Sequence, residues 1–179
     1  MKFNPAPTKE NAKKLKALYR SAFPRSERKP YAVMLKKQAE GIMELMTVED
    51  DDGKFLGLVI TILHNDIVLL DYFAVSPECR GQGIGSEVLK ELSRRYPGKT
   101  ILLEIEDPEI PNENQADRIR RKAFYLRNGM ICQDFKINFF GVEMLVLTNG
   151  AKVTFEEYHA IFEAHFSRTV QKNIRLRDE

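Results

Sequence analysis

The chain has 179 residues, of which 43% are hydrophobic and 30% charged, and its formal net charge is +2. This composition is ordinary for a globular protein, and the nearly balanced charge gives no reason to expect a nucleic acid or an anionic membrane as partner. The first residues lack the apolar core of a signal peptide, and no apolar run is long enough to span a bilayer. The two cysteines show neither metal-ligand spacing nor a secreted disulfide framework. We therefore expect a single cytoplasmic domain over residues 1–179 with no metal.

The first half of the chain predicts a strand, two helices and a meander of three strands. Thr8 can cap the first helix, which Pro24 ends, and Pro30 suits the first turn of the second helix. An Asp-Asp-Gly-Lys turn at 51–54 separates the first two strands of the meander. The predicted elements are a strand at 2–6, helices at 8–24 and 30–41, and strands at 42–48, 55–63 and 67–75.

The second half predicts an alternation of helices and strands. A helix opens near Gly83, and a later helix at 115–127 presents an apolar face of Ala116, Ile119, Ala123 and Leu126. Thr154 begins the last helix, which fades in the charged tail 172–179. The other predicted elements are strands at 101–106, 130–139 and 142–147. Together with the first half, this pattern predicts one α/β domain with a mixed sheet.

The segment between the strand at 67–75 and the next helix carries the strongest chemical signal. Gly81, Gly83 and Gly85 let the backbone turn sharply and approach a ligand closely. The N–H groups at the helix N-terminus favour a phosphate, and Arg80 adds a cation. A Walker A loop needs a lysine after its last glycine, and a dinucleotide fingerprint needs a glycine at position 86, but both places are held by Ser86. The alternative is a glycine-rich turn that binds nothing.

Two motifs link these patterns to a known family. Arg80, Gly83 and Gly85 form an Arg-x-x-Gly-x-Gly sequence after a strand that ends in Ala-Val-x-Pro, which resembles the coenzyme A loop of the GNAT superfamily of N-acetyltransferases. The run 123–130 resembles the family's Ala-x-Tyr-x-x-x-Gly-Phe signature, with Met130 in the phenylalanine place. The order of predicted elements matches that fold over nearly the whole chain. The resemblance implies a GNAT-like acyl-CoA N-acyltransferase fold with an extra C-terminal helix, and acetyl-CoA as the acyl donor.

The resemblance also implies which residues bind the donor. Backbone groups of Phe73 and Val75 would hold the pantetheine arm where the two central strands part, and the Val75 N–H would polarise the thioester carbonyl. Tyr125 matches the family's tyrosine beside the coenzyme A sulfur. The implied binding residues are Phe73, Ala74, Val75, Arg80, Gly81, Gln82, Gly83, Ile84, Gly85, Ser86 and Tyr125.

Acyl transfer to an amine calls for a general base, because an alkyl amine with a pKa near 10 is mostly protonated at neutral pH. Asp71 is the only charge in the apolar run 67–75, and strand alternation puts it on one face with Phe73 and Val75. Glu104 has a comparable place in the strand 101–106 and shares a face with Glu106. In the family, the Glu104 place holds the base of ribosomal-protein N-acetyltransferases, and the Asp71 place holds a histidine base in arylalkylamine enzymes.

These carboxylates have several alternative roles. Glu104 is the first candidate for the base and Asp71 the second, followed by Glu106 or a relayed water. In structural terms, Glu104 would be a hydrated carboxylate at a strand end, and Asp71 would pair with a nearby lysine or arginine.

Tyr125 is the candidate general acid. A phenol with a pKa near 10 is protonated at neutral pH and can supply a proton to a departing thiolate; alternatively, Tyr125 packs by Phe124 against the sheet. The chain departs from the family at Arg118, where an asparagine usually contacts the pantetheine. The basic run 118–122 could reach the donor's phosphates or form a solvated helix face.

The acceptor is the least determined part of the prediction. The fold would build its groove from the segments 23–31 and 138–142, and the acceptor would be a primary amine of a small molecule or a peptide. No nucleic acid or membrane partner is expected, and the chain would be a monomer or a homodimer. Two other classes stay open, which are a sensor that binds acyl-CoA without turnover and a protein that uses the loop for ATP or a dinucleotide.

Overall fold

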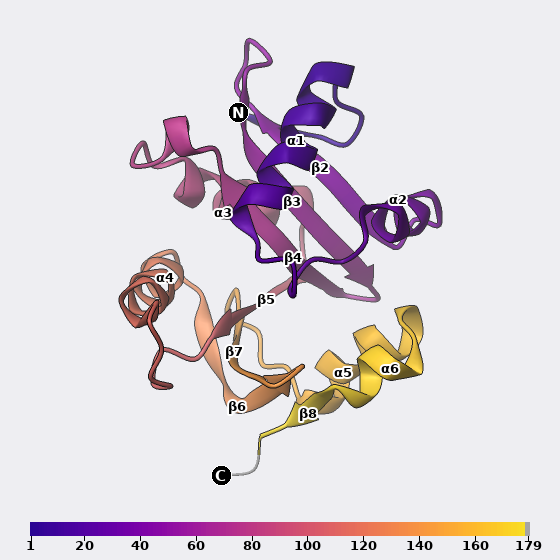
Figure 1. Cartoon of the computed structure of the whole chain (residues 1–179), viewed down its shortest axis with the longest axis vertical. Helices are drawn as coiled ribbons and strands as arrows, with labels where there is room; N and C mark the ends of the chain where they lie inside the picture. Colours follow the sequence, from indigo (N-terminus) through magenta and orange to yellow (C-terminus); the bar gives the residue numbers. More distant parts are fainter. Residues whose placement is uncertain (178–179) are drawn as a thin grey trace. The chain divides into compact units, whose positions relative to one another are not determined.

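The computed structural model describes residues 1–177, and the chain divides into two compact units, Met1–Lys99 and Thr100–Glu179. Each unit has antiparallel strands with helices packed against them (Figure 1). The predicted α/β class is therefore confirmed. None of the helices in the described part is both long and apolar enough to cross a membrane.

The first unit holds four antiparallel strands in the order β1-β2-β3-β4. Thr8 caps the first helix, since its hydroxyl accepts a hydrogen bond from the Asn11 N–H at 3.2 Å. The elements of this unit are β1 (Lys2–Asn4), α1 (Lys9–Ala22), α2 (Tyr31–Ala39), β2 (Met43–Glu49), β3 (Phe55–His64), β4 (Ile67–Val75), the short 3₁₀ turn η1 (Pro77–Cys79) and α3 (Ile84–Arg95).

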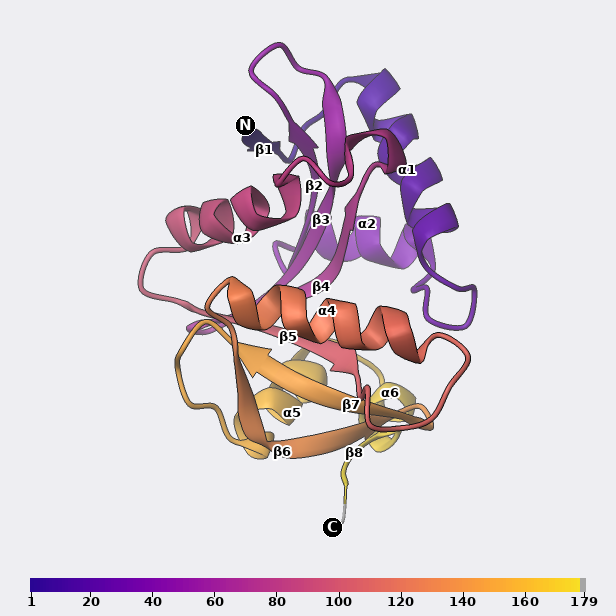
Figure 2. The same cartoon turned by 90° about the vertical axis from the view of Figure 1, so that its left-hand side faces the viewer.

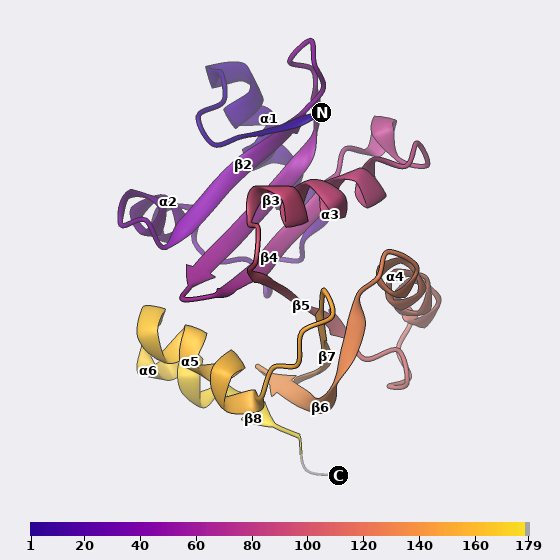
Figure 3. The ribbon, with the colours of Figure 1, turned by 180° about the vertical axis from the view of Figure 1, so that it is seen from behind.

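Helices cover both faces of these strands. In Figures 1 and 3, α1 crosses one face and α3 crosses the other. As a result, β2 and β3 are buried almost along their whole length, with Leu58, Val59 and Ile60 fully inaccessible. Burial on both faces explains why these strands read as continuous apolar runs in the sequence.

The second unit also has four antiparallel strands, in the order β5-β7-β6-β8. In Figure 2, α4 passes in front of these strands and α5 lies behind them. Phe140 and Gly141, both with positive φ, make the predicted turn between β6 and β7. The elements are β5 (Thr100–Glu106), α4 (Gln115–Arg127), β6 (Ile131–Phe139), β7 (Val142–Thr148), α5 (Phe155–His165), α6 (Arg168–Lys172) and β8 (Ile174–Leu176).

Two expectations for this unit were wrong. The predicted last helix ends at His165 and is followed by a separate helix, α6, and residues 174–176 of the predicted tail form β8, in which Ile174 pairs with Phe139 and Leu176 with Ile137 along β6. In α4, the apolar residues Ile119 and Leu126 are 53% and 44% exposed, whereas Arg118 and Tyr125 are buried. The last residues of the predicted tail, 178 and 179, lie outside the described part.

Candidate functional site

The glycine loop joins β4 to α3 as the sequence predicts. Gly83 is the N-cap of α3 and has φ +78°, and Gly81 has φ +75°, so both adopt the left-handed conformation that glycine tolerates best. Ile84 and Gly85 are the first residues of the helix, and their N–H groups have no intrahelical acceptor. A Cβ atom at Gly83 would meet nothing within 4 Å. The loop therefore offers helix N–H donors beside open space.

Contacts at both ends of the loop hold it in place. The Arg80 Nε donates to the Val75 carbonyl at 3.3 Å, and the Gln82 amide donates to the Glu78 carbonyl at 3.1 Å. Farther along α3, Arg95 donates to both carboxylate oxygens of Glu44 on β2, at 3.3 and 2.8 Å. These bonds tie the helix to the sheet, so its N-terminus is a preorganised feature of the first unit.

The predicted donor-binding residues of β4 lie directly before this loop. Phe73, Ala74 and Val75 pair with Val59, Leu58 and Gly57 of β3, and their side chains are partly exposed. A Cβ atom at Gly57 would come within 2.5 Å of the Ala74 carbonyl oxygen, so only glycine permits this approach of the two backbones. The end of β4 is thus fixed by close strand packing.

Asp71 lies at an irregularity of β4. Ile60 pairs with Tyr72 and Thr61 with Leu70, which leaves Asp71 as an extra residue in the ladder. Such a bulge interrupts the alternation of side chains, so the expected common face of Asp71, Phe73 and Val75 does not hold.

The bulge directs both Asp71 and Tyr72 to the connector between α1 and α2. The Lys29 Nζ donates to Asp71 Oδ1 at 2.7 Å, in a pair whose side chains are 19% and 5% exposed. The Tyr72 hydroxyl donates to the Glu27 carbonyl at 2.7 Å and accepts from the Lys29 N–H at 3.1 Å. Asp71 is therefore an ion-pair partner of the connector, as one of its alternative roles predicted.

The second oxygen of the Asp71 carboxylate is not part of this ion pair. Asp71 Oδ2 is buried and has no hydrogen-bond partner among the described residues. A buried carboxylate oxygen without a donor is costly, and ligand-binding or catalytic sites are one place where this cost is tolerated.

An aromatic cluster supports the connector and was not predicted. The Tyr72 ring makes edge contacts with Tyr19 and Phe23, with centroids 4.9 Å apart in each case. The Tyr19 hydroxyl donates to the Lys29 carbonyl at 3.0 Å. Burial, followed by its hydrogen bond with Tyr72, raises the pKa of Tyr19 well above its usual value. The only sequence signal for this cluster was a tyrosine inside an otherwise apolar strand.

In the second unit, Glu104 lies in the middle of β5, opposite Val146 of β7. The hydroxyl of Tyr158 donates a hydrogen bond to Glu104 Oε1. Tyr158 belongs to α5 and is fully buried. Glu104, the first candidate for the base, is thus hydrogen-bonded to α5, the helix predicted as an addition to the GNAT-like fold.

Glu106 is engaged differently. Arg118 Nη2 donates to Glu106 Oε1 at 2.5 Å and Arg121 Nη1 to Glu106 Oε2 at 3.1 Å, both from α4. With an arginine on each oxygen, Glu106 serves as a counter-ion, which argues against it as the base. The basic run is therefore not a uniformly solvated face, because Arg118 is 6% exposed.

Tyr125 is a buried residue of α4, and its ring packs against Phe124 in an edge contact at 5.1 Å. Burial raises the pKa of its phenol to about 12, although the nearby positive charge of Arg121 opposes that shift. No group among residues 1–177 is recorded in a hydrogen bond with its hydroxyl. The phenol is therefore protonated at neutral pH.

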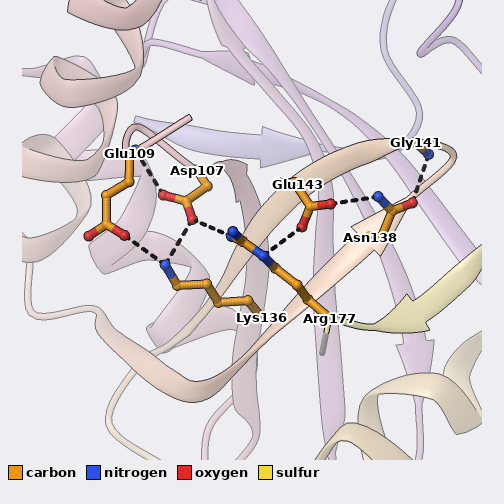
Figure 4. A network of polar contacts seen from close by, with 7 residues as sticks. All are labelled: Asp107, Glu109, Lys136, Asn138, Gly141, Glu143 and Arg177. Carbon is orange, nitrogen blue, oxygen red and sulfur yellow. Dashed lines mark hydrogen bonds and ion pairs between the residues drawn. The ribbon is translucent and has the colours of Figure 1, made fainter. Parts of the chain in front are cut away.

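A network of charged side chains lies where β5 ends (Figure 4). Asp107 is fully buried there. Its Oδ2 atom forms ion pairs with Lys136 Nζ at 2.9 Å and with Arg177 Nη1 at 3.3 Å. Arg177 also pairs with Glu143, with 3.3 Å between Nε and Oε2. The network ties β5, β6, β7 and the end of β8 together, which is a structural role. Among the described residues, no group of three or more His, Cys, Asp or Glu side chains is arranged to hold a metal.

The chain is similar in sequence to known acetyltransferases. Residues 43–129 match the model of the acetyltransferase (GNAT) domain. The chain is 34% identical over 77 residues to a putative acetyltransferase of Bacillus subtilis, a match that covers 43% of this chain and 37% of that protein.

Solved structures extend the likeness to the whole fold. A putative GNAT-family acetyltransferase from Bacteroides thetaiotaomicron superposes with a TM-score of 0.75 at 21% identity, covering 96% of this chain and 99% of that one. Spermidine N-acetyltransferase from Vibrio cholerae, in complex with CoA and spermine, gives 0.64 at 13% identity over 88% of this chain and 96% of that one. The predicted GNAT-like fold is confirmed, including the region beyond the domain match.

Proposed function

We propose that this chain, whose residues 43–129 carry an acetyltransferase (GNAT) domain, is an acetyl-CoA-dependent N-acetyltransferase. The observation that carries the proposal is the glycine loop, where two residues with positive φ precede the N-terminus of α3. N–H groups and the helix dipole at such a terminus bind a diphosphate well. The open space beside Gly83 fits a ligand that approaches the backbone. The proposed donor-binding residues are Phe73, Ala74 and Val75 of β4, residues 80–86 of the loop, and Tyr125.

The proposed reaction is direct transfer. The nitrogen of a neutral primary amine forms a bond to the acetyl carbonyl carbon, and the bond from that carbon to sulfur breaks. The amine loses a proton to a general base, and the leaving thiolate gains one. The Val75 N–H is the proposed donor to the carbonyl oxygen as charge develops on it.

We assign the base to Glu104 rather than to Asp71. Asp71 is already paired with the ammonium of Lys29 at 2.7 Å, so accepting a proton would break an ion pair whose two side chains are mostly buried. Glu104 accepts a hydrogen bond from the neutral hydroxyl of Tyr158, and protonation of Glu104 does not break an ion pair in this contact. Asp71 keeps one unpartnered oxygen, which makes it the alternative base.

Tyr125 is the proposed acid. With its pKa raised to about 12, the phenol holds its proton more tightly than a thiol of pKa about 8.5. Its contribution is therefore a hydrogen bond donated to the sulfur as negative charge develops, and a proton that passes to the thiolate is replaced on Tyr125 from solvent or from the protonated base.

The acceptor is proposed only as a class, a primary amine of a small molecule or a peptide. The spermidine enzyme of Vibrio cholerae acts on such an amine, but its 13% identity to this chain supports the fold alone. In this chain the connector between α1 and α2 carries Arg25, Arg28 and Lys29. We also place the protein in the cytoplasm, where acetyl-CoA is available, as a monomer or a homodimer.

Calorimetric titration with acetyl-CoA, ATP and NAD tests the donor. Gly83→Asp introduces a carboxylate at the helix N-terminus, and Gly83→Asn is its matched control, since both side chains tolerate positive φ and differ only in charge. We expect wild type to bind acetyl-CoA at micromolar concentration, and Gly83→Asp to bind at least about 100-fold more weakly than Gly83→Asn. Binding of ATP or NAD in place of acetyl-CoA would contradict the proposal.

A further inference from the structure

The hydroxyl of Tyr158 donates a hydrogen bond to the Oε1 atom of Glu104, although the two residues are 54 positions apart in the chain. Tyr158 is fully buried. A buried phenol hydroxyl needs a polar partner. The partner of Tyr158 is Glu104, the residue that we propose as the general base.

The position of Tyr158 is tightly fixed. A capping box between Thr154 and Glu157 starts α5 directly before it. The Tyr158 ring then packs against Phe162 and Phe135, with centroids 5.2 and 6.3 Å away. Because helix start and ring are both held, the hydroxyl has little freedom to leave Glu104.

Two residues near Glu104 in the strand order have recorded partners or pairings of their own. On β5, Glu106 carries a charge balanced by Arg118 and Arg121. On β7, the partner Val146 is apolar, as is Met144 beside it.

On α5, His159 follows Tyr158 in the chain and has partners of its own, since it bonds to the Gln171 carbonyl and lies 3.2 Å from Glu163. His165 and three glutamates are the other titratable side chains of this helix. Tyr158 is the one of these whose hydrogen bond to Glu104 is the basis of the inference.

We propose that Tyr158 is a positioning residue, which orients the Glu104 carboxylate and favours its ionised form during acetyl transfer. This inference rests on the proposed function. A hydrogen bond donated to a carboxylate stabilises its charged state and restricts its rotation. Tyr158 belongs to α5, which lies after the stretch 43–129 that matches the GNAT domain. The proposed orientation of Glu104 therefore depends on a helix outside the matched stretch.

The test variant is Tyr158→Phe, which keeps the ring packing and removes only the hydroxyl. Thiol release from acetyl-CoA is followed with spermidine, lysine and a short peptide with a free amino terminus. We expect kcat to fall about tenfold while KM for acetyl-CoA stays unchanged. The acidic limb of the pH–rate profile is expected to move to higher pH, because Glu104 gains its proton more readily without the donor.

Ile161→Ala is the matched control. Ile161 is a fully buried residue of the same helix, and its truncation loosens the packing of α5 without removing a ring that holds Tyr158. A purely structural role for Tyr158 predicts that both variants lose thermal stability and that neither shifts the pH–rate profile. An unshifted profile in Tyr158→Phe would overturn the inference.

A carbon-13 NMR titration of the Glu104 carboxyl in wild type and Tyr158→Phe measures the titration midpoint directly and requires no amine acceptor. We expect its midpoint at higher pH in the variant, and an unchanged midpoint would overturn the inference. If wild type releases thiol and both readouts are unchanged in Tyr158→Phe, only this inference fails. If wild type binds acetyl-CoA but releases no thiol with any amine, the proposed function fails as well.

Discussion

The two units of this chain carry different kinds of chemistry. In residues 1–99, the proposed donor site is mainly backbone, with glycines of positive φ before the N-terminus of α3. In residues 100–177, the proposed site consists of side chains, the carboxylate of Glu104 and the phenol of Tyr125. Backbone donors depend on chain geometry, whereas side-chain acids and bases depend on their neighbours. The comparison teaches that donor binding and turnover should respond to separate mutations.

The largest expected effect is a loss of turnover with little change in the affinity for acetyl-CoA. Removing a general base typically costs 10²- to 10⁴-fold in rate, so we expect Glu104→Gln to lower kcat about 10³-fold. The calorimetric Kd for acetyl-CoA should stay within about twofold, because Glu104 is not among the proposed donor-binding residues. Asp71→Asn is the matched variant, and a larger loss of kcat in it than in Glu104→Gln would transfer the role of base to Asp71.

The carboxylate of the first unit should instead matter for stability. Lys29→Met leaves Asp71, whose side chain is 5% exposed, without its counter-ion. We expect the free energy of unfolding to fall by about 3 kcal/mol, measured by urea denaturation. The Lys29→Met/Asp71→Asn double variant should recover much of that loss.

Lys36→Met is the control for Lys29→Met. The Lys36 side chain is 79% exposed and lies 3.9 Å from Glu40, so its removal should change stability by less than about 0.5 kcal/mol. Equal losses in the two lysine variants would show that the pair with Asp71 is not what stabilises the connector.

Tyr125→Phe should have an intermediate effect. Loss of one hydrogen bond to the leaving sulfur is expected to lower kcat about tenfold. Because the pKa of Tyr125 is about 12, its ionisation should produce no loss of wild-type activity between about pH 8 and 10. Full turnover in Tyr125→Phe would remove the residue from the mechanism.

The smallest effect concerns a buried carboxylate that has no proposed part in the reaction. Burial tends to raise the pKa of Asp107, but the Glu109 N–H and the Lys136 ammonium outweigh burial and hold that pKa below its usual range. A depressed folded-state pKa contributes stability above the unfolded value near 3.8, and that stability is lost as pH falls through the folded value.

The stability of wild type and Asp107→Asn should therefore differ by about 1 kcal/mol or more at pH 7, and the difference should shrink progressively as pH falls below about 4. Urea denaturation at a series of pH values measures this difference. Turnover at neutral pH should change little in the part of the Asp107→Asn population that remains folded. A stability difference that does not depend on pH would mean that the ionised form of Asp107 is not what stabilises the network.

Most of the fold and the donor loop could be predicted from the sequence, because their signals are local. Thr8 and the capping box of α5 lie within three residues of the groups they bond. Gly81 and Gly83 precede a helix that they themselves permit.

The missed features depend on partners far away in the chain. The bulge at Asp71 is set by register with β3, and the bond between Glu104 and Tyr158 spans 54 positions. Helix α6 has only five residues and depends on contacts such as Gln171 Nε2 with the Phe166 carbonyl at 2.8 Å. Periodicity also favoured Ile119 for the buried face of α4, yet Arg118 is buried because Glu106 neutralises it.

The most direct test of the central claim is amine-dependent thiol release by the wild-type protein, with acetyl-CoA as donor. The proposal predicts thiol release that rises with amine concentration and yields an equal amount of N-acetylated product by mass spectrometry. Saturable binding of acetyl-CoA with no thiol release for any primary amine would contradict it, and would identify the chain as an acyl-CoA sensor.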